Sequence, residues 1–315
     1  MDVLVLGGGS FVGRWIVEDL LERGHTLTLF SRGKTGVGLF DGVERLIGDR
    51  ETGDYEALAG HVWDAVVDVS GYVPRHVEQA IQALHETPGR YVFISTGLVY
   101  DRALAPEPIT ETSPRLAPEW QSEEIDDDTY GPLKVACEDV LAARLGTRGT
   151  VVRPGWVVGP YELAERLTYW VRRAAGAGPV AVPLRLDRPV QVVDVRDVAR
   201  LVTHLLERNL PGAFNAVGPT PAVTLAQLIR ACGDAELIPV EGGELDFPLT
   251  LPDESWDVMF RISAAAAHAA GMPRTSLSST IAATRAWDLE RGEPPLKSGL
   301  SDEHESELLA AALPR

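Results

Sequence analysis

The stretch TYGPLKVACE places Tyr130 four residues before Lys134, in a chain that contains only three lysines. On a helix, residues i and i+4 lie on one face, so the phenol and the ammonium can point into the same cleft. A tyrosine titrates near about 10, and a nearby ammonium favours the phenolate and lowers that pKa. The pair therefore predicts an acid–base centre in which Tyr130 exchanges a proton with a substrate oxygen. The alternative is that both residues lie on the surface of an amphipathic helix.

A glycine-rich turn, LGGGSFVGR, joins a short apolar run at Val3–Leu6 to a helical pattern. A helix N-terminus offers free amide N–H groups and the positive end of the helix dipole, which suit a pyrophosphate. Glycines let the backbone approach the phosphates and let helix and strand pack closely. Ser10 occupies the place of the usual middle glycine. The turn predicts a dinucleotide site that includes Gly7, Gly9, Ser10, Phe11, Val12 and Gly13.

The residues after the second apolar run, Ser31-Arg32-Gly33-Lys34, indicate which dinucleotide binds. An acidic residue at this place would hydrogen-bond the ribose 2′-hydroxyl of NAD. Here no carboxylate repels a 2′-phosphate, and the guanidinium of Arg32 can bind one. Ser31, Arg32 and Lys34 therefore predict NADP(H) as the cofactor, with NAD as the alternative.

The elements that must position these residues alternate between apolar runs and helical patterns, which predicts an α/β fold with a doubly wound parallel sheet of the Rossmann type. The expected strands are Val3–Leu6, Thr26–Phe30, Val43–Ile47, Ala65–Val69, Tyr91–Ser95, Thr150–Arg153, Val190–Val193 and Ala213–Ala216. The expected helices are Phe11–Arg23, His76–Leu84, Tyr130–Leu145, Ala164–Ala175, Val195–Arg208, Thr224–Cys232, Ile262–Ala270 and Asp302–Ala312.

The alternation weakens after Gly155, which suggests a smaller C-terminal lobe. We expect an NADP-binding Rossmann domain from 1–154 and 187–220, and a substrate-binding lobe from 155–186 and 221–315. Residues 101–128 are rich in proline and acid and show no periodicity. They are expected to form either a solvated surface loop or a loop that covers the site.

Composition narrows the classes of partner. The net charge of −17 argues against nucleic acid and against anionic membranes, because both bind through lysine and arginine patches. Two cysteines far apart form no disulfide framework, and the seven histidines show no metal-ligand spacing, so no metal is expected. We expect a cytoplasmic protein that acts on a small-molecule substrate.

Five segments in this order resemble the extended short-chain dehydrogenase/reductase family, also called the NAD-dependent epimerase/dehydratase family: LGGGSFVGR, FSRGK, YVFISTGLVY, TYGPLK and VRPGWVVGP. The first two are most similar to an atypical subgroup that includes chloroplast stem-loop RNA-binding proteins and bacterial homologues. The resemblance covers roughly residues 1–220. It implies a nicotinamide cofactor, and it makes a homodimer through exposed helices an expectation.

The resemblance also implies roles for individual residues. It assigns catalysis to a hydroxyl residue, a tyrosine and a lysine, which here are Thr96, Tyr130 and Lys134, with Ser95 beside Thr96. Lys134 would also bind the nicotinamide ribose, and Tyr130 would likewise be among the residues that contact the cofactor. Further cofactor contacts would fall on Asp49 near the adenine, on Ser70 and Gly71, and on Pro154, Trp156 and Val157.

Two departures from the family pattern affect the reaction. Gly97-Leu98 follow Thr96 where family dehydratases have an Asp-Glu pair, which disfavours dehydration. The helix at His76–Leu84 lacks the asparagine common in sugar-nucleotide epimerases. The leading hypothesis is an NADP(H)-dependent oxidoreductase that acts on a carbonyl or a secondary alcohol. The alternatives are a sugar-nucleotide epimerase, for which Arg185 and Arg188 would reach an anionic substrate, and a dinucleotide-binding regulator without turnover.

Overall fold

The computed structural model describes residues 1–85, 88–241 and 247–312, and the chain forms two compact units. The first unit comprises Met1–Gly155, Arg196–Ala216 and Ser263–Pro273. The second comprises Trp156–Val195, Val217–Ile262 and Arg274–Arg315. The division expected from the sequence gave 187–195 and 217–220 to the first domain, whereas the structure gives them to the second unit.

The first unit contains a seven-stranded sheet in the order β11-β6-β5-β4-β1-β2-β3, and every neighbouring pair is parallel. This order confirms the predicted Rossmann-type sheet, because it reverses direction between β1 and β4. The strands are β1 (Asp2–Leu6), β2 (Thr26–Ser31), β3 (Glu44–Ile47), β4 (Ala65–Asp68), β5 (Arg90–Ile94), β6 (Gly149–Pro154) and β11 (Gly212–Ala216).

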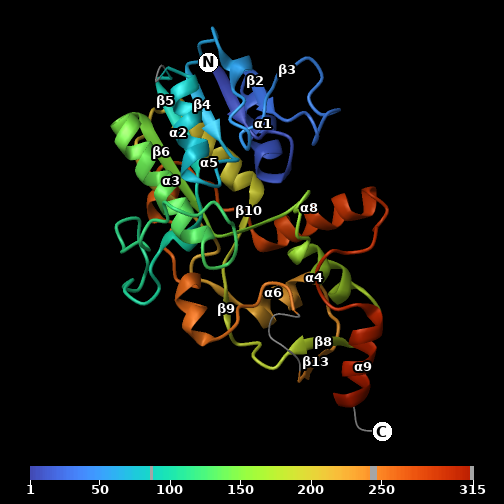
Figure 1. Cartoon of the computed structure of the whole chain (residues 1–315). Helices are drawn as coiled ribbons and strands as arrows, with labels where there is room; N and C mark the ends of the chain where they lie inside the picture. The colour runs from blue at the N-terminus through green and yellow to red at the C-terminus, as the bar shows by residue number, and fades with distance from the viewer. Residues whose placement is uncertain (86–87, 242–246, 313–315) are drawn as a thin grey trace. The chain divides into compact units, whose positions relative to one another are not determined.

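Helices cover both faces of this sheet because its central strands are apolar on both sides. Leu4 and Leu6 pack on one face against α2 and α3, which lie side by side (Figure 1). On the other face α1 lies beside α5, where Arg23 pairs with Glu207 at 3.2 Å. The helices are α1 (Phe11–Glu22), α2 (Pro74–Ala83), α3 (Tyr130–Leu145), α5 (Val195–Glu207) and α7 (Ala265–Ala269), with 3₁₀ turns η1 (Glu56–Leu58), η2 (Gly97–Val99) and η3 (Gly146–Arg148).

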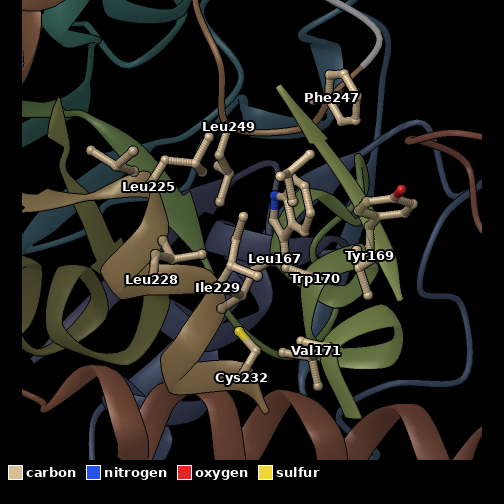
Figure 2. Close-up of a cluster of buried hydrophobic side chains, with 14 of the residues drawn as sticks. Leu167, Tyr169, Trp170, Val171, Leu225, Leu228, Ile229, Cys232, Phe247 and Leu249 are labelled. Carbon is tan, nitrogen blue, oxygen red and sulfur yellow. The ribbon is translucent and has the colours of Figure 1, made fainter. Parts of the chain in front are cut away.

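The second unit is built around a buried cluster to which α4 contributes Leu167, Trp170 and Val171 (Figure 2). The Trp170 indole donates to the carbonyl oxygen of Pro248 at 2.8 Å, so its one polar atom is satisfied. Its strands pair as β7 (Trp156–Val158) with β10 (Val192–Asp194), β8 (Val180–Pro183) with β13 (Leu237–Val240), and β9 (Pro189–Val190) with β12 (Val223–Thr224). Its helices are α4 (Arg166–Ala175), α6 (Leu225–Cys232), α8 (Leu277–Glu290) and α9 (Asp302–Ala312), with the 3₁₀ helix η5 (Glu254–Phe260).

Helix α8 was absent from the sequence-based expectation, and its buried residues explain why. Thr280, Thr284 and Asp288 are buried together with Ile281, so polar residues interrupt the apolar pattern of the inward face and weaken its periodicity. These polar groups are satisfied inside the unit: Thr280 donates to Asp194 at 2.7 Å, and Asp288 accepts two hydrogen bonds from Arg172.

The loop 101–128 forms no helix or strand, and every one of its residues is described. It is nevertheless held to the first unit by backbone hydrogen bonds. Leu116 N donates to Val99 O at 2.8 Å, and Glu119 N donates to Pro132 O at 3.1 Å. Ile109 is fully buried. The loop is therefore packed against the fold along much of its length, which differs from a freely solvated segment.

Within the described part of the chain, no helix combines the length and the apolar character that a membrane crossing requires.

Candidate active site

The glycine-rich turn lies where the strand order reverses, between β1 and β4. Gly7 has a φ of +96°, which an L side chain rarely adopts, and a Cβ there would lie 2.9 Å from the side chain of Ser70. A Cβ on Gly13 would overlap the carbonyl oxygen of Gly7. The glycines thus let β1, the start of α1 and the end of β4 meet closely at the carboxyl edge of the sheet, where open α/β sheets bind ligands.

The N-terminus of α1 is suited to a phosphate group. Among the described residues, no side chain caps this end of the helix, and its first turn contains no acidic residue. The first amide groups of a helix have no partner within it, so those near Phe11, Val12 and Gly13 can donate to an anion. The turn therefore fits the pyrophosphate of a dinucleotide.

The loop after β2 carries Arg32 and Lys34, and both side chains are exposed. This loop approaches the glycine turn so closely that a Cβ on Gly9 would lie 2.5 Å from the carbonyl oxygen of Thr35. The Ser31 hydroxyl accepts a hydrogen bond from Gly33 N at 3.3 Å and shapes the bend. The two cations thus lie on a segment that contacts the expected dinucleotide turn.

Asp49 follows β3 and is half-buried in a tight turn. Its backbone N–H donates to Asp54 O at 3.0 Å, and its carboxylate accepts from Glu51 N at 3.1 Å. The expected contact between Asp49 and an adenine stays a prediction.

Lys134 is 2 % exposed, and its ammonium joins the ends of two strands. It donates to Ile94 O, at the end of β5, and to Gly71 O, after β4, each at 2.7 Å. The Nζ atom also lies 4.1 Å from the centre of the Phe93 ring. Burial lowers the pKa of Lys134 to about 8. Since Gly71 follows Ser70, the lysine lies one residue from the segment that meets the glycine turn.

Tyr130 begins α3, and its hydroxyl lies near the side chain of Thr96. Burial raises the pKa of Tyr130 to about 12, Tyr72 adds to the rise, and the Thr96 side chain opposes it. This differs from the expectation that Lys134 would lower this pKa. The physical reason is that the lysine directs its ammonium to two carbonyl oxygens, while the phenol is desolvated. Tyr130 is thus protonated at neutral pH.

The structure therefore brings together Thr96, Tyr130, Lys134 and Gly71 in the first unit, and it connects them through Ser70 to Gly7. Tyr72, which the sequence did not single out, belongs to the same place: its ring centre lies 5.7 Å from Lys134 Nζ, and its side chain is exposed. Its position directly after Ser70-Gly71, two predicted cofactor contacts, could have indicated in the sequence that Tyr72 belongs to the site.

The remaining predicted residues lie near the end of β6. Pro154 closes that strand in the first unit, and it is buried. Trp156 and Val157 begin β7 in the second unit, where the Trp156 ring packs edge-on against Phe260 with centroids 4.8 Å apart. Their expected contact with a nicotinamide stays a prediction.

A buried ion pair lies beneath Ser70, next to the site, and sequence reasoning missed it as well. Arg50 donates to both carboxylate oxygens of Asp68, at 2.5 and 2.8 Å, and to Ser70 Oγ at 3.0 Å. Burial alone would raise the pKa of Asp68, but Arg50 and Tyr91 hold it below its ordinary value. Asp68 is a charged residue at the end of the otherwise apolar strand Ala65–Asp68, and this feature of the sequence could have indicated a buried ion pair.

Replacing Asp68 by asparagine is expected to lower the free energy of unfolding by about 3–5 kcal/mol, because Arg50 would stay buried without its counter-charge. Urea unfolding at neutral pH measures the loss, and Asp41→Asn on the exposed loop after β2 is the matched control. Since the pKa of Asp68 is depressed in the folded state, its contribution is present above the ordinary aspartate pKa and is lost as the pH falls below it. An unchanged midpoint for Asp68→Asn would contradict this account.

Among the described residues, no group of three or more His, Cys, Asp or Glu side chains is arranged to hold a metal ion. Cys137 is buried behind Lys134, and burial raises its pKa to about 12, so its thiol is not an activated nucleophile.

A Rossmann sheet, a glycine turn at its switch point and a Tyr-x-x-x-Lys helix define a class of dinucleotide-binding proteins. The NAD dependent epimerase/dehydratase family matches residues 3–217, and the chain belongs to this family.

Individual relatives are more distant. The chloroplast stem-loop binding protein of 41 kDa b from Arabidopsis thaliana is 25% identical over 268 residues, which cover 78% of this chain and 67% of the relative. The UDP-glucose 4-epimerase of Thermotoga maritima, solved with UDP-glucose, has a TM-score of 0.67 at 18% identity and covers 92% of this chain and 99% of its own. Human epimerase family protein SDR39U1, solved with NADPH, has a TM-score of 0.61 at 22% identity, covering 91% and 99%. At these identities the solved structures establish a shared fold.

Proposed function

We propose that this protein is an NADP(H)-dependent oxidoreductase that transfers hydride between the cofactor and a carbonyl or secondary alcohol. The observation that carries the proposal is the meeting of Thr96, Tyr130 and Lys134 beside Gly71, one residue from the segment that contacts the glycine turn. A dinucleotide whose pyrophosphate binds at α1 would extend along this edge toward the phenol.

The chain's own residues supply binding, orientation and a proton. The amides of the α1 N-terminus would hold the pyrophosphate, and Lys134 would donate to the nicotinamide ribose. When bound, the cofactor supplies the hydride. Thr96 would orient the substrate oxygen, and Tyr130 would give it a proton. Because the pKa of Tyr130 is about 12 without a ligand, the phenol is protonated at neutral pH, which suits carbonyl reduction.

The assignment of NADP(H) rests on Arg32 and Lys34, and the human relative's structure with NADPH agrees with it. Replacing both cations by alanine is expected to weaken NADPH binding about 10²- to 10⁴-fold, because each charge-assisted hydrogen bond to the 2′-phosphate is worth about 1.5–3 kcal/mol. Fluorescence titration with NADPH measures the effect. NADH lacks this phosphate and serves as the internal control, and tighter binding of NADH than NADPH by the unaltered protein would contradict the assignment.

The main alternative is a sugar-nucleotide epimerase, which the fold likeness to the Thermotoga maritima enzyme favours. One observation weighs against it. Arg188 is 7 % exposed and donates to Asp257, Leu251 O and Asp253 O, while Arg185 pairs with Asp187 and Glu254. Arg188 is thus engaged inside the second unit, whereas Arg185 forms an exposed ion pair on it.

A panel of aldehydes, ketones and secondary alcohols, followed by NADPH absorbance, tests the proposal. We expect net oxidation of NADPH with at least one carbonyl class. Conversion of UDP-glucose without net change in NADPH would instead establish an epimerase. Binding of NADPH without turnover of the carbonyl and alcohol panel or of UDP-glucose would favour the dinucleotide-binding regulator. RNA binding that survives moderate salt would connect this protein to the stem-loop-binding relative.

A further inference from the structure

Helix α3 contacts three consecutive residues at the end of β5. Lys134 donates to Ile94 O at 2.7 Å, the Ser95 hydroxyl donates to Glu138 Oε1 at 2.7 Å, and the Tyr130 hydroxyl lies near the side chain of Thr96. Tyr130, Lys134 and Glu138 are spaced one helical turn apart, so they lie along the same side of α3. Two of these three contacts involve the proposed triad, whereas the third, between Ser95 and Glu138, has no role in the proposed chemistry.

The Glu138 carboxylate is held from several directions. It is 4 % exposed, and Arg153 donates to both of its oxygens, at 3.0 and 2.7 Å. Arg153 is itself 5 % exposed and also donates to the Tyr100 hydroxyl at 2.8 Å. A buried carboxylate with this many charged and polar partners has a strongly fixed position, because any movement leaves a buried charge unpaired.

The same network includes the loop 101–128. Arg115 donates to Glu138 Oε2 at 2.9 Å and to Asp139 at 2.8 Å. Arg153 donates to Glu111 O at 3.0 Å, and the Glu111 carboxylate accepts from Asn215 N on β11 at 2.9 Å. Residues 111–115 of the loop are therefore tied to α3, β6 and β11 through charged groups.

We propose that Glu138 is a positioning residue for Thr96, Tyr130 and Lys134. Through Ser95 it fixes the strand end that carries Thr96, and through Arg115 it ties the loop 101–128 to the same helix. The inference rests on the proposed function of the triad. The inference also gives the two neighbouring hydroxyl residues different roles. Ser95 is 5 % exposed and donates to Glu138, so it helps to position the strand end. Thr96 remains the residue that would bind the substrate oxygen.

Ser95→Ala is the sharpest variant, because it removes one hydroxyl and leaves the buried Glu138–Arg153 pair intact. A misplacement of about 1 Å at a reacting centre can cost on the order of 100-fold in rate. We expect kcat to fall about 10-fold, with unchanged KM for NADPH and a small fall in the unfolding midpoint, because one hydrogen bond to a buried carboxylate is lost. Asp139→Ala is the matched control, since it removes a contact of Arg115 without touching Ser95 or Glu138. Full kcat in Ser95→Ala overturns the proposal.

A double-mutant cycle distinguishes positioning through Ser95 from a general loss of structure. If Glu138 acts through the Ser95 hydroxyl, Ser95→Ala combined with Glu138→Gln is no slower than Glu138→Gln alone. A double variant whose loss of kcat equals the product of the two single losses overturns the proposal. If Glu138→Gln does not fold, the kcat of Ser95→Ala alone tests the proposal.

Crystal structures of Ser95→Ala and the unaltered protein supply a readout that requires no turnover. We expect the Thr96 side chain to move away from the Tyr130 hydroxyl in the variant. An unchanged Thr96–Tyr130 contact overturns the positioning role even if the protein reduces no carbonyl, and a displaced contact in an inactive protein leaves the positioning role standing while the proposed function fails.

Discussion

Tyr130→Phe is expected to lower kcat by about 10²- to 10⁴-fold, the range that general acid catalysis contributes. The variant keeps the ring and removes only the hydroxyl that lies near Thr96 and would protonate the substrate oxygen. Because the dinucleotide is expected to be held chiefly by the α1 N-terminus, Arg32 and Lys134, the dissociation constant for NADPH should stay within a factor of about 2, less than the effect of one ordinary hydrogen bond. Steady-state kinetics with a carbonyl substrate and a separate NADPH titration measure the two effects.

Comparing the effects on kcat and on NADPH binding identifies the role of Tyr130. Lost turnover with intact NADPH binding assigns Tyr130 to the proton transfer. Turnover at the rate of the unaltered protein would exclude the assignment, and loss of NADPH binding would place the phenol in cofactor recognition instead.

Lys134→Met is expected to lower kcat/KM by at least about 100-fold, and here NADPH binding should weaken as well. Lys134 is the ammonium at the ends of β4 and β5, and it would donate to the nicotinamide ribose. Methionine retains the length and apolar stem of lysine but no donor. Lys297→Met is the matched control, since Lys297 is exposed in the second unit. Equal NADPH affinity in Lys134→Met and in the control would contradict the ribose contact.

The lowered pKa of Lys134 predicts a pH dependence of the same step. Burial lowers this pKa to about 8, while that of Tyr130 is raised to about 12. As the pH rises through about 8, the free protein loses the Lys134 proton while Tyr130 stays protonated. The profile of kcat/KM should therefore fall on the alkaline side near 8, with the lysine as its cause. A profile that stays flat up to pH 10 would exclude this origin.

The sequence predicted the first unit well because its signals are local. Strands such as Val3–Leu6 are continuous apolar runs, and Gly24 ends α1 with a φ of +78°, as a C-terminal glycine does. Helix α3 has the predicted bounds Tyr130–Leu145, so the i, i+4 relation of Tyr130 and Lys134 follows directly.

The parts that the sequence did not reveal depend on long-range polar contacts. The pair of Arg50 with Asp68 and the pair of Glu138 with Arg153 join residues on different elements, and neither leaves a periodic trace. The direction of the Tyr130 pKa shift was likewise inaccessible, because it depends on desolvation and on where the Lys134 ammonium points. In the second unit, α8 buries two threonines and an aspartate beside Ile281, which weakens its apolar periodicity.

The most direct test of the central claim is a crystal structure of the protein with NADPH. The account predicts the pyrophosphate at the N-terminus of α1, the 2′-phosphate beside Arg32, and the nicotinamide ribose within hydrogen-bond distance of Lys134 Nζ, with the ring facing Tyr130. A nicotinamide that contacts neither the Tyr130 hydroxyl nor Lys134 Nζ would contradict it.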